Sequence, residues 1–221
     1  MKAIYLYILL GIIVISSQLL HFELLENFSK PLLMPSLILV YLYHCEFNRF
    51  DYLIISALFF SMLGDIFLMP FFNHFIGGLA AFLLAHLLYI QAFRSEKRRS
   101  FPFSKSVYYK SGTALLFYFG LLFIIYQKLI PEQTALFLLI AIGIYATALL
   151  LLLIFSILRN PVNPKSYTLI SLGAAFFLLS DGFLAINKFV FELPYSTLWV
   201  MPTYLLAQYL IVKGSLLRNS L

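Results

Sequence analysis

The chain has 221 residues, of which 62% are hydrophobic and 11% are charged, whereas about a quarter of the residues of an ordinary soluble domain are charged. This composition excludes a soluble globular protein and predicts an all-α integral membrane protein. The formal charge of +6 does not indicate nucleic-acid binding, because most Lys and Arg residues lie between the apolar runs, where such residues set membrane topology.

Eight apolar runs, each of about the length of a transmembrane helix, follow one another along the chain. The first run lacks the small-residue cleavage pattern of a signal peptide, and we expect it to be retained as a helix. The predicted spans are 3–20, 30–45, 51–70, 75–93, 108–127, 133–157, 167–188 and 194–216. Together they predict a single eight-helix transmembrane domain over residues 1–221, with no stretch left over for a soluble domain.

The distribution of basic residues predicts the orientation of these spans. With eight spans both termini share a face, and that face holds twelve of the fifteen Lys and Arg residues, including the cluster "RSEKRRS" at 94–100. The other face keeps Lys30, Lys128 and Lys188. Because basic residues concentrate in cytoplasmic loops, we expect cytoplasmic N- and C-termini in a multi-pass protein of the cell membrane, here a bacterial inner membrane. The basic cluster is interpreted as a topology anchor, with binding of anionic lipids or a partner as the alternative.

The two halves of the chain contain similar stretches of sequence in the same order. Aligning Asp65 with Asp181 sets "ALFFSMLGDIFL" over "GAAFFLLSDGFL" with five identities, and the next helices align "FLLAHLLYI" with "YLLAQYLIV", which places His86 over Gln208. The matched helices run in the same direction, so this pattern predicts two parallel four-helix repeats, residues 1–93 and 108–216. The repeat would bring the two carboxylates to corresponding depths in the bilayer.

Asp65 and Asp181 are the strongest candidate functional residues. An ionisable side chain inside a span costs about 2.5–3.5 kcal/mol on insertion scales, and it usually faces the bundle interior or a water-filled cavity. The structural alternative is that each aspartate only accepts hydrogen bonds from a neighbouring helix. His86 lies near the membrane centre, where a role in the site and a role in locking two helices together are equally favoured.

Further polar residues surround this pair in the predicted topology. Lys30 begins the second span, and Asn187 with Lys188 ends the seventh, on the same side as the carboxylates. Both lysines are candidate partners of a phosphate or carboxylate, and snorkelling to the interface is the alternative. Tyr204 and Gln208 are typical of hydrogen bonding between helices and are also candidate substrate-binding residues.

Several chemistries have no support in the sequence. The chain has no Gly-x-Ser-x-Gly elbow, no His-Glu-x-x-His motif and no Walker loop. His86 alone of the four histidines lies deep in a span, and Cys45 is the single cysteine. We therefore expect no metal site and no cofactor.

Five ordered blocks, "KPLLMP", "SMLGDIFLM", "GLAAFLLAHLLY", "LLSDGFLAINKF" and "TYLLAQYLI", make the chain similar to the YhhN family of eight-helix membrane proteins from about Lys30 to Gly214. The animal members of that family are lysoplasmalogenases. The resemblance implies hydrolysis of the vinyl ether bond of a lysoplasmalogen to a fatty aldehyde and glycerophospho-ethanolamine or -choline. The residues that match the family pattern are Lys30, Asp65, His86, Asp181, Asn187, Lys188 and Gln208.

The residues suit this chemistry. Protonation of the outer vinyl carbon forms an oxocarbenium ion, which requires an acid and a nearby negative charge, and a carboxylate pair sharing one proton provides both. The expected partners are a lysophospholipid substrate within the bilayer and membrane lipids. No nucleic acid is expected, and the formation of a homo-oligomer is left open. A lipid or small-molecule transporter with a midplane carboxylate site is the second hypothesis, and a structural subunit with a buried polar network is the third.

Overall fold

The structure is a computed structural model that describes residues 2–96, 105–131, 136–159 and 163–218. Every regular element in these ranges is helical, which confirms the all-α prediction. The elements are α1 (Lys2–Leu19), α2 (Glu23–Ser29), a 3₁₀ turn η1 (Lys30–Leu32), α3 (Leu33–Leu42), α4 (Arg49–Phe67), α5 (Phe75–Ser95), α6 (Lys105–Leu129), α7 (Leu136–Ile157), α8 (Pro164–Phe189) and α9 (Ser196–Leu216).

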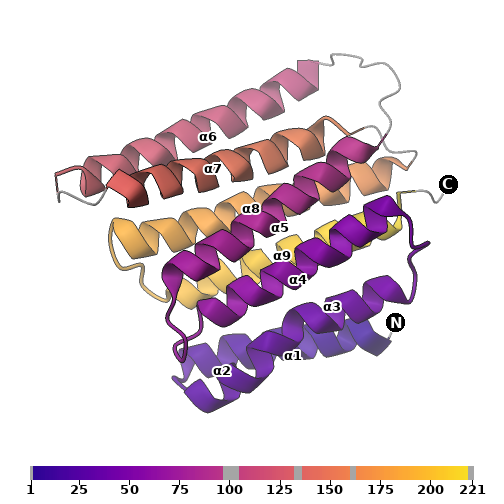
Figure 1. Cartoon of the computed structure of the whole chain (residues 1–221), viewed down its shortest axis with the longest axis horizontal. Coiled ribbons are helices and arrows are strands. Elements are labelled where there is room, and N and C mark those ends of the chain that lie inside the picture. Colours follow the sequence, from indigo (N-terminus) through magenta and orange to yellow (C-terminus); the bar gives the residue numbers. More distant parts are fainter. Residues whose placement is uncertain (1, 97–104, 132–135, 160–162, 219–221) are drawn as a thin grey trace.

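The helices run back and forth, so that the start of α1 and the end of α9 lie at the same end of the bundle (Figure 1). We call this the terminal end and the opposite one the far end. Helices α4 and α8 both run from the terminal end to the far end, and α5 and α9 return. This arrangement is the one that two parallel repeats would produce. The assignment of the terminal end to the cytoplasm stays a prediction, and residues 97–100 of the basic cluster lie outside the described ranges.

Within the described ranges, five helical stretches are long and apolar enough to cross a membrane by length and composition: α4, α5, residues 111–129 of α6, α7 and α8. The apolar part of α1, Ile4–Leu19, is shorter. These stretches support membrane insertion, and the count of eight spans stays a prediction. Of the predicted sixth span, residues 133–135 lie outside the described ranges.

The predicted second span differs from the structure. Instead of one helix over 30–45, the chain is helical from Glu23 to Leu42, with a 3₁₀ turn in the middle where Pro31 cannot donate a backbone hydrogen bond. In the structure Glu26 is buried and bonded to Lys30 and Gln18, so its charge is satisfied within the fold and the helix begins about two turns earlier.

The ends of α4 position one of the aspartates. Asn48 and Asp51 form a capping box at the start of this helix, each side chain accepting a backbone N–H of the other residue. The helix ends at Phe67, because Pro70 disfavours helical backbone at the residue before it. Asp65 therefore lies in the last turn of α4, whereas Asp181 lies about 12 Å before the end of α8 at 1.5 Å per residue. The two carboxylates are thus at unequal distances from their helix ends.

Helices α8 and α9 approach closely through glycines. A Cβ atom on Gly173 would lie 2.9 Å from the backbone oxygen of Ala207 and 2.8 Å from the Cγ1 atom of Ile211. Gly214 makes the reciprocal approach, since its Cβ would lie 2.6 Å from Ile170. The spacing of these two helices thus depends on residues without side chains.

Gly173→Ala is expected to destabilise the protein by about 1–3 kcal/mol, the usual cost of overpacking a tight interface. The matched control is Gly112→Ala on α6, where nothing lies within 4 Å of the added methyl. There the change should be neutral or slightly stabilising, because alanine favours helix. Thermal unfolding of the detergent-solubilised protein measures both, and equal melting temperatures for the two variants would contradict the close packing.

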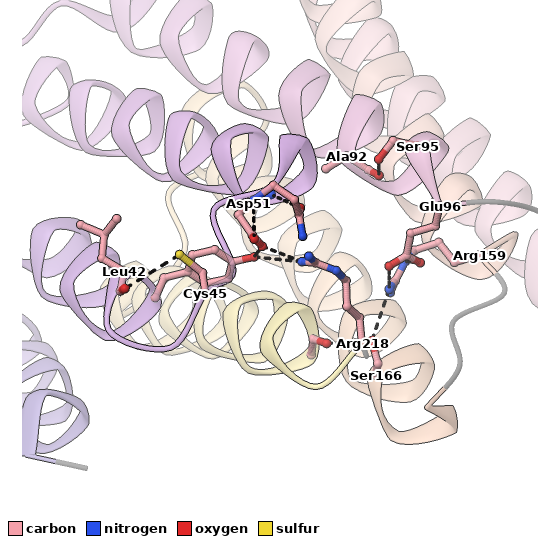
Figure 2. A network of polar contacts seen from close by, with 12 residues as sticks. Leu42, Cys45, Asp51, Ala92, Ser95, Glu96, Arg159, Ser166 and Arg218 are labelled. Atoms are coloured by element: carbon pink, nitrogen blue, oxygen red, sulfur yellow. Dashed lines mark hydrogen bonds and ion pairs between the residues drawn. The ribbon is translucent and has the colours of Figure 1, made fainter. Parts of the chain in front are cut away.

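Two buried ion pairs tie the helices together at the terminal end (Figure 2). Arg218, just beyond α9, donates to Asp51 of α4 at 2.6 Å, and Arg159, just beyond α7, binds Glu96 through two hydrogen bonds of 2.7 and 2.9 Å. Arg159 also donates to Ser166 of α8. These contacts connect segments that are far apart in the sequence. They lie at the terminal end of the bundle, and the candidate site lies at the far end.

Candidate functional site

Asp65 and Asp181 line one cavity of about 180 Å³ in the far half of the bundle. The cavity is bounded by the end of α4, the second half of α8, the first turns of α9, and residues of α1 and η1. Asp65 is 4% exposed, and the side chain of Asp181 is 9% exposed. Of the predicted site residues, Lys30, Asn187 and Tyr204 line the same cavity.

Asp65 is held by a residue from another helix. The hydroxyl of Tyr204 on α9 donates to its Oδ2 atom at 2.7 Å. The ring of Tyr204 is fixed by edge contacts with Phe82 and Phe177, at centroid distances of 5.9 and 5.6 Å. This packing aims the hydroxyl at the carboxylate and leaves little freedom to the pair.

Asp181 has a different set of neighbours. The hydroxyl of Tyr145 on α7 donates to its Oδ2 atom, and the Nε2 atom of His86 on α5 lies 3.8 Å from the same oxygen. His86 is fully buried against Phe177, at 4.8 Å between ring centroids, and neither of its ring nitrogens has a hydrogen-bond partner in the described part of the chain. The structure therefore places His86 behind Asp181, outside the cavity lining.

The contacts of Gln208 match those of His86 in the other half. Gln208 accepts a hydrogen bond from Tyr89 at 2.7 Å and donates to Ser61 at 3.0 Å, one helical turn before Asp65. In the sequence alignment Ser61 corresponds to Phe177, which is the residue that His86 contacts. The related positions thus pack alike, with Gln208 forming a hydrogen-bonded support behind the cavity and not part of its wall.

The two aspartates are nevertheless chemically unequal. The residue that corresponds to Tyr204 in the first half is Phe82, which has no hydroxyl to donate. Asp181 takes its hydrogen bond from Tyr145 instead, and Tyr145 belongs to a different helix from the one the repeat would suggest. This departure from symmetry gives each carboxylate its own surroundings.

A buried basic group lies at one side of the cavity. The Nζ atom of Lys30 bonds Glu26 Oε1 at 3.2 Å, and Gln18 donates to the same oxygen at 2.7 Å. Lys30 and Gln18 both line the cavity, and the buried Oε1 atom of Gln18 has no partner among the described residues. Cation and amide thus offer a donor and an acceptor to a polar ligand.

Of the two polar residues that end the seventh predicted span, one lines the cavity. Asn187 lines it, while its Oδ1 atom accepts the backbone N–H of Leu193 at 2.8 Å and so anchors the connection to α9. Lys188 is exposed and extends over the ring of Phe75, with 5.4 Å from Nζ to the centroid. It does not line the cavity, so the structure does not bring Lys188 together with the carboxylates.

Sequence reasoning did not find Tyr145, Glu26 or Gln18. Tyr145 stands in a strongly apolar run without a neighbouring polar residue, and its role depends on the packing of α7 against α8. The i, i+4 spacing of Glu26 and Lys30 was an available signal for a helical ion pair. Within the described residues no group of three or more His, Cys, Asp and Glu side chains could hold a metal ion.

These features define a class of protein: an all-helical membrane protein that buries two carboxylates and an amine around one cavity. A comparison with models of known protein families gives a match along most of the chain. The chain matches the YhhN family over residues 25–215 and belongs to that family. No solved structure matches the chain.

Several curated relatives are similar to this chain. They include lysoplasmalogenase TMEM86B of Sus scrofa, 36% identical over 71% of this chain and 60% of the relative. Lysoplasmalogenase TMEM86A of Homo sapiens is 29% identical over 73% of this chain and 64% of the relative, and TMEM86B of Rattus norvegicus is 31% identical over 76% and 64%. The chain thus spans less than two thirds of the length of these relatives. The apolar helices and these relatives together identify it as an integral membrane protein.

Proposed function

We propose that this protein is a membrane-embedded hydrolase that cleaves the vinyl ether bond of lysoplasmalogens. The observation that carries the proposal is the placement of Asp65 and Asp181 on one cavity together with the buried Lys30. The names of the curated relatives support the same reaction. The products would be a fatty aldehyde and glycerophospho-ethanolamine or glycerophospho-choline.

The reaction begins with a proton transfer to carbon. A carboxylic acid donates its proton to the outer carbon of the vinyl ether, and the inner carbon becomes an oxocarbenium ion that a nearby carboxylate stabilises. Water then adds to this carbon, the second carboxylate takes up its proton, and a hemiacetal forms. In the collapse of the hemiacetal the hydroxyl group returns its proton to the first carboxylate, the bond between carbon and the glycerol oxygen breaks, and the second carboxyl group protonates that oxygen, so that one water is consumed in total.

The pair can supply both functions because two carboxylates in a low-dielectric cavity do not readily ionise together. We assign the negative charge to Asp65, since its cavity wall includes the ammonium group of Lys30, and the proton to Asp181. The hydroxyls of Tyr204 and Tyr145 hold the two carboxyl groups in place. Two carboxylates with unequal environments divide acid and base roles in glycoside hydrolysis in the same way.

The head group would lie at the polar side of the cavity. Lys30 can pair with the phosphate, and the unpartnered Oε1 atom of Gln18 can accept a hydrogen bond from a glycerol hydroxyl or an ethanolamine ammonium group. Ser196 and Thr197 at the start of α9 add hydroxyl groups to the lining. His86 and Gln208 would support the site from behind.

The decisive experiment is mass spectrometry of a lysolipid mixture before and after incubation with the purified protein. The mixture should contain a 1-alkenyl lysophosphoethanolamine, the matching 1-alkyl ether and the matching ester. We expect loss of the alkenyl lipid alone, with a fatty aldehyde and glycerophosphoethanolamine formed in equal amounts. Cleavage of the ester, or of no lipid at all, would overturn the proposal. Uptake of an unchanged lipid into proteoliposomes would favour the transporter hypothesis.

A further inference from the structure

We propose that the groove between α6 and α8 binds the hydrocarbon tail of the lipid whose polar part occupies the carboxylate cavity. This inference rests on the proposed function and deepens it, because it gives the substrate a direction: head group toward Lys30, tail along α8 toward the terminal end. It also identifies the residues that would set chain-length preference.

The groove is large and apolar. It has a volume of about 540 Å³, within the range of about 300–1,000 Å³ that is usual for ligand pockets. Helix α8 forms its floor, with Leu172, Ala175 and Leu179 on one face, and Phe117 of α6 and Leu153 of α7 form its sides. An aliphatic chain is the ligand that such a surface binds.

The threonine and serine hydroxyl groups in the lining already donate to backbone carbonyls of the protein. Thr113 donates to the carbonyl of Tyr109, Thr168 donates to Pro164, and Ser171 donates to the carbonyl of Ser156. A polar ligand would therefore lose hydrogen bonds to water and find few donors in return. This favours a hydrocarbon over a sugar, peptide or nucleotide as the occupant.

A narrow apolar gap borders the carboxylate cavity and approaches the groove. This gap, of about 50 Å³, is lined by Asp181, Gly182 and residues of α5, α6 and α7, and it shares Leu68, Phe82, Asp181 and Leu184 with the cavity. A Cβ atom on Gly182 would lie 3.7 Å from Phe117, which also lines the groove. The gap and the groove have no lining residue in common, and the approach of Gly182 to Phe117 is the point where a tail would pass from Asp181 into the groove.

The path is long enough for a membrane lipid. Along α8 the groove extends from Leu179, two residues before Asp181, to Tyr167. Asp181 lies fourteen residues after Tyr167, a distance of about 21 Å along the helix at 1.5 Å per residue. The tail of a membrane lipid crosses half of a hydrocarbon core of about 30 Å, which is a shorter distance. A single tail therefore fits along this face with its first carbons beside Asp181.

This direction also suits the chemistry. In a vinyl ether the carbon that receives the proton lies on the tail side of the bond, and the ether oxygen lies on the head-group side. With the tail in the groove, the tail-side carbon is nearest to Asp181, which borders the gap, and the oxygen is nearer to Asp65 and Lys30. The geometry thus agrees with Asp181 as the proton donor.

Photo-crosslinking tests the groove without requiring any cleavage. The probe is an ester-linked lysophosphatidylcholine that carries a diazirine near the end of its chain, added to the full-length protein in nanodiscs and mapped by peptide mass spectrometry. We expect crosslinks to concentrate on groove residues of α6 and α8, such as Phe117 and Leu172, and to be displaced by excess unlabelled lipid. Crosslinks spread evenly over the outer face of α6, including the exposed Leu116, would mean annular lipid only and would overturn the inference.

Substitutions test the same path by its chain-length dependence. Ala175→Trp fills the groove, and Leu116→Trp adds the same side chain on the outward face of α6 as a matched control. We expect Ala175→Trp to lower turnover of a long-chain alkenyl lysolipid by about tenfold or more, an effect of the size that a few displaced methylenes produce, and to leave a short-chain analogue and the Leu116→Trp control unaffected. Gly182→Leu, which narrows the passage, should give the same selective loss.

The outcomes separate this inference from the proposed function. Specific crosslinks without any hydrolysis would overturn the proposed reaction and keep the tail site. Hydrolysis with uniform crosslinking, or with equal losses for long and short chains in Ala175→Trp, would overturn the tail site and keep the reaction.

Discussion

Asp181→Asn and Asp65→Asn are each expected to lower the rate of aldehyde release by about 10²–10⁴-fold, the range usual for the loss of a positioned acid or base. Asparagine keeps the size of the side chain and can still accept the hydrogen bond from Tyr145 or Tyr204. It can neither donate an acidic proton to carbon nor carry the negative charge that stabilises an oxocarbenium ion. The measurement is single-turnover release of aldehyde from an alkenyl lysolipid by the purified variants.

The matched control is Glu192→Gln, which removes an exposed carboxylate from the loop between α8 and α9. It should leave turnover unchanged. Thermal unfolding of all three variants separates a catalytic loss from a folding loss. If both aspartate variants unfold like the parent protein and still release aldehyde at the parent rate, the carboxylate mechanism is wrong.

Arg218→Ala is expected to destabilise the protein by on the order of 3 kcal/mol, because it leaves the carboxylate of Asp51 buried without its ion partner. Asp51 is 1% exposed and accepts hydrogen bonds from Arg218 and from Tyr41, at 2.6 and 2.7 Å (Figure 2). Burial alone would lower the pKa of Arg218, but the hydrogen bonds and charges of Asp51 and Tyr41 together outweigh it and the pKa is raised, so the guanidinium keeps its charge. Denaturation of the solubilised protein measures the loss.

Arg49→Ala is the control for this prediction, since Arg49 lies exposed at the start of the same helix and exposed substitutions usually change stability by about 0.5 kcal/mol or less. Asp51→Asn in the Arg218→Ala background should recover part of the loss, because the remaining buried group is then neutral. Equal stabilities of Arg218→Ala and Arg49→Ala would show that the ion pair contributes nothing to the fold.

The two aspartates illustrate how far sequence reasoning reaches in this chain. Their position in apolar runs identified both as candidate site residues, and the repeat placed them in helices that run the same way, which the structure also has. Their unequal distances from the helix ends could not be predicted from the repeat, because Pro70 ends α4 early and α8 has no proline at the corresponding place.

The residues that surround the aspartates were harder to predict, because their contacts depend on which helices pack together. Tyr145 and Gln18 reach the site from α7 and α1, and nothing in their local sequence distinguishes them from other polar side chains in apolar helices. Lys188 looked equivalent to Lys30 by topology, yet it points over Phe75 while Lys30 is buried with Glu26. Which way a long side chain turns depends on the neighbouring helices.

Composition and hydropathy alone were sufficient to establish helical elements and membrane insertion, because backbone groups in lipid must be satisfied within each segment and this requires long apolar helices. The same pattern, with its ordered motifs, was sufficient to recognise the family. Tertiary packing decided the rest. It brings Asp65, Asp181 and Lys30 to one cavity, gives each carboxylate its own tyrosine partner, and forms the groove beside α6. Apolar side chains specify that a helix is buried in lipid or protein, but they do not specify which neighbour it meets or where a gap is left between helices.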